Sequence, residues 1–301
     1  MGKFNEQVLQ PVMEIFKVGK NEKSEFLYTG FKITQDDSGI LLDQRSYVEN
    51  LEIEEITPTR ALEKEDSLSA TECTLLRRIC GALNWIVMAT RPDLSFDLIE
   101  LSTKQQRGKV QDLVRARKVL KNINPEECRL FFPKLTGKHL ELLVYTDASF
   151  GNLDNGAGSM GGHIVFLKDS NNKCAVLDWK SKKVKRVVRS TLAAEALALG
   201  DGLETALFEK EVFKELFGQE VKILVIAIVD NKSVEVNLRS TSSVEDKRLR
   251  RDLSMIKEML DRGEVHSVRW VDGKLQLADT LTKKGVNSLK LQAVLQMGSF
   301  K

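Results

Sequence analysis

The sequence predicts an α/β protein in which a five-stranded mixed sheet flanked by helices follows a hairpin and a helical region. Two observations lead to this prediction. Near residue 134 the chain changes from helical periodicity to a succession of β-rich runs, which precede one long helical stretch and then alternating strand and helix patterns. The run ILVIAIVD, residues 223–230, has no polar alternation, which is typical of a strand covered on both faces. This order favours three antiparallel strands with two parallel strands added.

The first predicted region comprises residues 1–134. Residues 25–51 predict a hairpin of two β-rich runs joined at Gly39, with a short helix after it. Three helical patterns follow, over residues 75–86, from Pro92 onward and over residues 110–123. The segment FFPKLTGKHL, residues 131–140, is the predicted linker to the second region.

The second predicted region comprises residues 135–301. Three β-rich runs joined by turns rich in Gly, Asn and Asp predict a meander over residues 140–147, 161–169 and 174–181. A long helix follows, which Ser190 or Thr191 can cap, and Gly200 and Gly202 predict a bend or close packing within it. The remaining predicted elements are a strand over 223–230, a helix over 249–260, a strand over 264–271 and a last helix over 275–284.

Composition excludes several classes of protein. With 301 residues, 42% of them hydrophobic and 30% charged, the chain can bury a sizeable core and is not disordered. Its longest apolar run is seven residues, far short of the about 18 that cross a bilayer, and the start MGKFNEQV lacks a signal-peptide core. We therefore expect an intracellular protein without a membrane partner. The cysteines form no CxxC pair, which favours reduced buried thiols at Cys73, Cys80, Cys128 and Cys174.

Four isolated carboxylates stand out at the ends of predicted elements. Asp147 and Asp230 each end a buried run, and parallel neighbouring strands would place the two carboxylates side by side. Glu195 lies early in the long helix and Asp279 in the last helix, both among small apolar residues. Like charges this close persist chiefly around a divalent cation. The alternative is that each carboxylate finds its own hydrogen-bond partners at its strand or helix end and takes no part in a shared site.

The segments LVYTDAS, STLAAEALAL, IVDNKS and QLADTLTK together resemble the four motif blocks of the ribonuclease H domain of copia-type retrotransposon Pol polyproteins. Upstream, FLYTGFKI and RRICGALNWIVMATRPDLSF are similar to the end of the palm and the thumb or connection of the reverse transcriptase in that family. The resemblance implies a ribonuclease H-like domain over 135–301, preceded by the reverse transcriptase segment over 1–134. It also implies a location in the cytoplasm, within a retrotransposon particle, or in the nucleus.

The resemblance assigns metal-binding and catalytic roles to Asp147, Glu195, Asp230 and Asp279. The implied activity is endonucleolytic hydrolysis of the RNA strand of RNA–DNA hybrids with two Mg²⁺ ions, for which Mn²⁺ can substitute. The implied partners are the hybrid and the remaining Pol segments, namely the palm and fingers of the reverse transcriptase and the integrase.

Basic residues before the Glu195 helix are candidates for contacts with the phosphate backbone. Residues 180–189 hold six of them and no acid: Lys180, Lys182, Lys183, Lys185, Arg186 and Arg189. The alternative is a solvated basic loop. A second cluster at a predicted helix start either binds nucleic acid or pairs with Glu245 and Asp246, and comprises Lys247, Arg248, Arg250 and Arg251. We assign Trp179 and Trp270 to the core rather than to base stacking.

Two departures from the family affect the implied activities. The only adjacent aspartates, Asp36 and Asp37, lie in a predicted hairpin turn and not in the polymerase motif, so no polymerase activity is expected from this fragment. Cellular ribonucleases H carry a histidine before the last catalytic aspartate, and residues 271–278 contain none, which implies slow turnover.

Two other functions remain open at this point. The first is a catalytically inactive or domesticated fragment that binds nucleic acid through the basic segment. The second is an integrase or transposase, which shares this kind of sheet but takes its last acid from a helix after the fourth strand. The early position of Glu195 and the absence of Cys/His zinc spacing argue against the second.

Overall fold

The computed structural model describes residues 10–16, 24–137, 139–153, 158–219, 221–240 and 244–300. Its largest element is a five-stranded sheet with the order β7-β6-β5-β8-β9. Adjacent strands pair antiparallel among β5 (Leu140–Leu153), β6 (Gly158–Asp169) and β7 (Cys174–Lys183). The pairings of β8 (Ile223–Val229) with β5 and of β9 (Ser267–Trp270) with β8 are parallel. The predicted α/β class and mixed sheet are confirmed.

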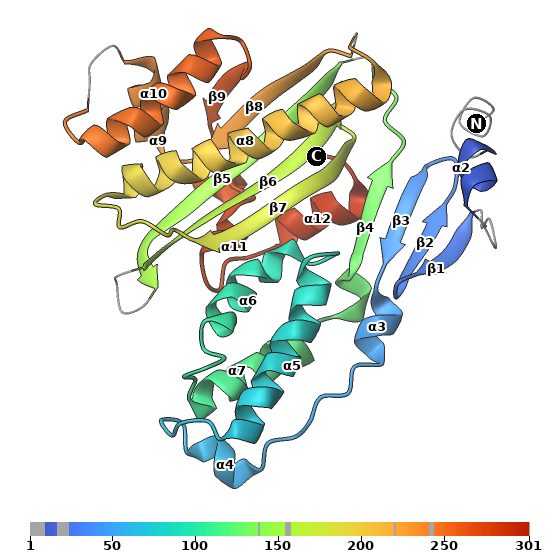
Figure 1. The fold of residues 1–301 in the computed structure, drawn as a ribbon, viewed down its shortest axis with the longest axis vertical. Helices are drawn as coiled ribbons and strands as arrows, with labels where there is room; N and C mark the ends of the chain where they lie inside the picture. Colours follow the sequence, from blue (N-terminus) through green and yellow to red (C-terminus); the bar gives the residue numbers. More distant parts are fainter. Residues whose placement is uncertain are drawn as a thin grey trace.

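Helices cover both faces of this sheet because its strands are apolar on both sides (Figure 1). Leu142 and Val144 of β5 belong to a buried cluster with α8 (Thr191–Phe217), α9 (Lys232–Arg239) and α10 (Lys247–Asp261). Leu143 belongs to the cluster on the opposite face, with α11 (Asp279–Thr282) and α12 (Leu289–Met297). Each large apolar side chain buried in this way stabilises the fold by about 1.5–3 kcal/mol.

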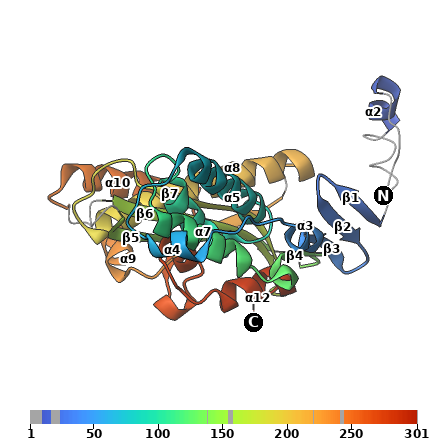
Figure 2. The same cartoon turned by 90° about the horizontal axis from the view of Figure 1, so that it is seen from below.

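A smaller sheet of four antiparallel strands lies beside the larger one (Figure 2). Its strands are β1 (Glu25–Tyr28), β2 (Phe31–Gln35), β3 (Gly39–Asp43) and β4 (Arg129–Pro133). Three helices pack around a separate apolar cluster: α5 (Ala70–Val87), α6 (Ser95–Ser102) and α7 (Val110–Lys121). The remaining α-helices are short: α2 (Gln10–Ile15), α3 (Arg45–Glu49) and α4 (Pro58–Leu62). Pro92–Leu94, Pro125–Glu127 and Gly273–Leu275 form 3-10 turns.

The hairpin and linker predictions for the first region are wrong in detail. Residues 25–43 form three strands instead of two, because Thr29 and Gly30 adopt positive φ angles of 47° and 89° and turn the chain between β1 and β2. The predicted linker begins inside β4, whose Phe131 pairs with Leu41 of β3. This pairing joins segments almost 90 residues apart in the chain, so local patterns did not predict it.

Two predictions for the second region also change. Asp147 does not end its strand, since β5 continues to Leu153 and pairs there with Gly158. The last predicted helix is shorter, over Asp279–Thr282, while α9 and α12 were not predicted. Residues 154–157 of the predicted turn and the segment MGKFNEQV lie outside the described residues. No helix in the described ranges is long and apolar enough to span a membrane.

Candidate functional site

Parallel pairing of β5 and β8 brings Asp147 and Asp230 to the same edge of the sheet. The register runs from Leu140 opposite Ile223 to Tyr145 opposite Ile228. Asp147 and Asp230 each lie two residues beyond the last of these pairs. The prediction that the two strands are parallel neighbours is therefore confirmed. Only β8 ends next to its aspartate, because β5 continues beyond Asp147.

Helix α8 carries Glu195 to the same edge. Ser190 caps the helix, because its hydroxyl oxygen accepts a hydrogen bond from the Ala193 backbone N–H at 3.2 Å. Small side chains let the helix approach the sheet closely, with Ala194 and Ala198 packed against Ala148 of β5. The alanines around Glu195 are thus explained by packing, because larger side chains would keep α8 away from the sheet.

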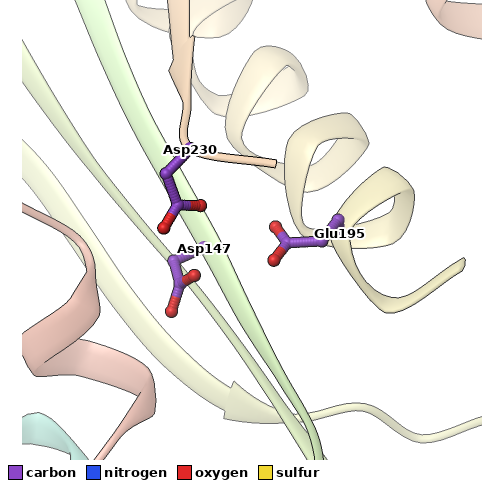
Figure 3. Close-up of side chains that lie close together, drawn as sticks. All are labelled: Asp147, Glu195 and Asp230. Carbon is purple, nitrogen blue, oxygen red and sulfur yellow. The ribbon is translucent and has the colours of Figure 1, made fainter. Parts of the chain in front are cut away.

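Three of the four predicted acids converge. One carboxylate oxygen from each of Asp147, Glu195 and Asp230 lies within 4.8 Å of the other two, and Figure 3 shows the Glu195 side chain directed from its helix toward the two aspartates. Burial raises the pKa of Glu195 to about 9, with further contributions from the charges of Asp147 and Asp230. Burial and the Asp147 charge also raise the pKa of Asp230. A cation between these groups would offset the repulsion that contributes, after burial, to both raised pKa values.

The oxygen donors fit a hard divalent cation. Glu195 is 4% exposed, and its Oε2 atom has no hydrogen-bond partner among the described residues. Buried polar atoms without a partner are rare in folded proteins, and a carboxylate oxygen in this state is suited to metal coordination. An open cavity of about 570 Å³ adjoins the three acids, so solvent and a ligand can reach them.

Asp279 lies next to this group, but the Lys283 side chain lies between the Asp279 and Asp147 carboxylates. The Lys283 Nζ atom lies 2.7 Å from Asp279 Oδ1 and 3.2 Å from Asp147 Oδ1. The hydroxyl of Thr282 donates to the other oxygen of Asp147. Burial raises the pKa of Asp279 to about 6, and the neighbouring Lys283 opposes this shift. Thr282 and Lys283 were not predicted as site residues, although the four-residue spacing of Lys283 from Asp279 on a helix was a signal for the second.

The predicted basic residues differ in exposure, and Lys182 and Arg186 form ion pairs with acids of two helices. Lys182 forms an ion pair with Asp201 at 2.5 Å, and Arg186 pairs with Asp252. The exposed residues are Lys180, Lys183, Lys185 and Arg189. Residues 180–183 belong to strand β7, so the segment is only partly a loop.

The second basic cluster meets the first across a cavity of about 360 Å³, which is lined by Arg186, Arg189, Lys247 and Arg248 among others. Asp246 caps α10, with its carboxylate accepting hydrogen bonds from the backbone N–H groups of Arg248 and Leu249 at 2.8 and 3.1 Å. The Arg250 guanidinium donates to the backbone carbonyls of Val244 and Glu245, and both alternatives for this cluster, nucleic-acid binding and pairing with the acids, stay open.

The two tryptophans have different environments. Trp179 is half-buried and its indole N–H donates to the Val87 carbonyl at 3.1 Å, so it belongs to the packing between the two regions. The core prediction for Trp270 is wrong: the side chain is 44% exposed, because β9 is an edge strand. Its N–H donates to the carbonyl of Asp230 at 2.8 Å. The four cysteines are free thiols, three of them buried and Cys73 partly buried.

Searches of solved structures return ribonucleases H and reverse transcriptases at low similarity. The ribonuclease H1 of Halobacterium salinarum is 19% identical with a TM-score of 0.34, covering 47% of this chain and 94% of that protein. A foamy viral protease–reverse transcriptase in complex with RNA/DNA hybrid is 13% identical with a TM-score of 0.41, covering 95% of this chain and 34% of that protein. No protein-family model matches the chain.

Sequence relatives are retrotransposon proteins. The retrovirus-related Pol polyproteins of the transposons RE1 and RE2 of Arabidopsis thaliana are 24% and 26% identical over 289 and 290 residues. The alignments cover 91% of this chain and 19% of each polyprotein, so the chain spans about a fifth of their length. A putative transposon Ty5-1 protein of Saccharomyces cerevisiae is 26% identical over 201 residues, which is 62% of either chain. The chain is therefore similar in sequence to a segment of retrotransposon Pol polyproteins, and its described residues form a five-stranded mixed sheet that follows a smaller sheet and three packed helices.

Proposed function

We propose that this chain is a ribonuclease H-type endonuclease that hydrolyses the RNA strand of RNA–DNA hybrids with divalent metal ions, as part of a retrotransposon polyprotein. The convergence of Asp147, Glu195 and Asp230 within 4.8 Å, with one buried Glu195 oxygen unpartnered, is the observation that carries the proposal. The relationship to Pol polyproteins supports the hybrid as substrate. In this proposal residues 1–134 are the reverse transcriptase segment and residues 135–301 the ribonuclease H domain.

The four acids Asp147, Glu195, Asp230 and Asp279 are the proposed metal-binding and catalytic residues, with Mg²⁺ as the cofactor and Mn²⁺ as a substitute. All donors are carboxylate oxygens, which suit these ions better than zinc. When bound, the ions would lower the pKa of an attacking water and stabilise the charge on the leaving oxygen.

The protein itself supplies orientation and a negative field at the sheet edge. Asp147 is fully buried and its two oxygens face the Thr282 hydroxyl and the Lys283 ammonium, so the carboxylate is oriented before any ligand arrives. Asp230 lies at the rim of the cavity, and Trp270 holds its backbone through the carbonyl. A scissile phosphate entering the cavity would therefore meet fixed groups rather than mobile side chains.

Cleavage of labelled substrates tests the proposal. Wild type should cut an RNA–DNA hybrid with Mg²⁺ or Mn²⁺ and not with EDTA, and should leave RNA and DNA duplexes intact. Glu195→Gln and Asp147→Asn should lower the turnover number by at least about a hundredfold while retaining hybrid binding, because they remove groups that act in the transition state. Normal hybrid binding by wild type without cleavage in either metal would favour the inactive, nucleic-acid-binding fragment.

Hybrid binding through the basic segment has its own test. Replacing the exposed Lys180, Lys185 and Arg189 with Ala should lower the slope of log affinity against log salt by about 0.9 for each phosphate that the variant no longer neutralises. The matched control, Lys182→Ala with Arg186→Ala, removes residues already paired with Asp201 and Asp252 and should change the slope less. An unchanged slope in the triple variant would identify the segment as a solvated surface.

A further inference from the structure

Lys283 lies between Asp147 and Asp279 as an internal counter-ion. Its Nζ atom is 3.2 Å from Asp147 Oδ1 and 2.7 Å from Asp279 Oδ1. Because Thr282 donates to the other oxygen of Asp147, both oxygens of this carboxylate face donors from the same short segment. Asp147 therefore has no oxygen free for a cation on the Asp279 side while Lys283 remains in place.

Side chains of β5 and β7 hold the backbone just before Lys283 through hydrogen bonds. The carbonyl of Thr282 accepts hydrogen bonds from the Ser149 hydroxyl at 2.8 Å and the Asn152 amide at 3.0 Å. The carbonyl of Leu281 accepts one from the Ser181 hydroxyl at 2.6 Å. Three side chains from two strands thus hold the residues just before Lys283, so its position is built into the fold.

Lys283 also separates Asp279 from the other three acids. It lines the open cavity of about 570 Å³ together with Asp147, Glu195 and Asp230. Asp279 instead lines a different cavity of about 620 Å³, with Gly273 and Leu291 among its other lining residues. The three acids face one another directly, whereas Asp279 meets the group only across the ammonium.

We infer that the Lys283 ammonium occupies the place of a second cation, so that the site takes one divalent ion at Asp147, Glu195 and Asp230 and takes a second only when Lys283 is removed. This inference rests on the proposed metal-dependent function, changes its stoichiometry from the expected two ions, and makes Asp279 a metal ligand only when Lys283 is removed. A second ion in contact with Asp147 and Asp279 would have to break both ion pairs and would face a positive charge a few ångströms away. Lys283 is a positioning residue here, acting through the charge and orientation of Asp147.

Calorimetric titration of the full chain with Mn²⁺ tests the inference. Wild type should bind one Mn²⁺, and Lys283→Met should bind two, the second at least about tenfold more tightly than any second ion in wild type. Lys283→Arg retains the charge and should behave as wild type. The control is Lys284→Met, which removes the same charge from an exposed neighbour that forms no ion pair with the described residues.

Thermal unfolding in EDTA supplies a second readout. Removing the ammonium leaves Asp147 and Asp279 without their shared counter-ion, so Lys283→Met and Lys283→Gln should melt below Lys284→Met without metal and recover with saturating Mn²⁺. Equal stoichiometry and affinity in wild type and both neutral variants would overturn the inference and leave the proposed function intact. Failure of every variant, wild type included, to bind Mn²⁺ would instead overturn the proposed metal site.

Discussion

Glu195 illustrates how burial changes the chemistry of a single residue. Its carboxylate lies beneath the first turns of α8, 4% exposed, and it faces two other acids. The pKa of about 9 that results means that the metal-free protein holds a proton on Glu195 at neutral pH. A bound cation must displace that proton, so metal affinity should rise with pH.

We expect the stability of the metal-free protein to fall as pH rises from about 5 to 9. Between the ordinary pKa of 4.5 and the folded value of about 9, the folded chain binds one proton more than the unfolded chain. The free energy of unfolding therefore decreases with pH, by up to about 1.4 kcal/mol per pH unit for this one group. Urea unfolding in EDTA at several pH values measures the slope.

Glu195→Gln is the control for this pH dependence, because it keeps the shape of the side chain and removes its titration. The Asp230 and Asp279 carboxyls also have raised pKa values and contribute slopes of the same sign in both proteins. The difference between wild type and variant isolates Glu195. Parallel curves for the two proteins would show that Glu195 titrates normally.

At the scale of single elements, the position of α8 depends on glycine. A Cβ atom at Gly202 would lie 2.7 Å from Thr146 Cγ2 and 3.0 Å from Val144 Cγ1. Both neighbours are β-branched side chains of β5, with few other rotamers available. The close packing predicted for this part of the helix is confirmed, and it holds Glu195 against the strand that carries Asp147.

Gly202→Ala should therefore destabilise the protein by about 1–3 kcal/mol, because the added methyl overpacks the interface between helix and sheet. Gly200→Ala is the matched control, since its Cβ would meet only the flexible end of Met255 at 3.1 Å. Alanine favours a helix by about 1 kcal/mol over glycine, so this control should be neutral or slightly stabilising. Denaturant unfolding of both variants decides, and equal effects would contradict the packing argument.

At the scale of the whole molecule, the region that precedes the larger sheet shares buried contacts with that sheet. Leu130 of β4 belongs to the same apolar cluster as Phe166 of β6 and Leu291 of α12. Arg91 is 5% exposed and pairs with Asp93 at 2.8 Å and Glu127 at 3.0 Å. Gln292 of α12 donates to both of these acids, which links the C-terminal helix to the first region.

Arg91→Ala should cost about 3–5 kcal/mol of stability, because it leaves the buried Asp93 carboxylate without its partner. Arg262→Ala is the matched control: Arg262 also pairs with two acids, Glu258 and Glu264, but its side chain is 64% exposed and both acids are exposed as well. Such a partly solvated arginine should contribute about 1 kcal/mol or less. Chemical unfolding of both variants measures the difference, and a small effect at Arg91 would show that this network contributes little to the joining of the two regions.

The sequence by itself determined the class of the fold, most strands and long helices of the sheet, and the acids that converge at its edge. Local patterns predict these features: apolar runs, helical spacing and isolated carboxylates among small residues. The resemblance to Pol polyproteins was likewise carried by short segments and is confirmed by relatives aligned over 91% of the chain.

Only the tertiary structure decided which segments that are distant in the chain contact one another. Strand β4 pairs with β3, Trp270 is exposed on an edge strand, and Lys182 and Arg186 are paired with acids from two helices. Lys283 lies against Asp147, 136 residues away in the chain, and no local pattern contains that contact. The physical reason is the same in each case: burial and charge pairing depend on which elements the packed core brings together, and spacing along the chain does not specify those neighbours.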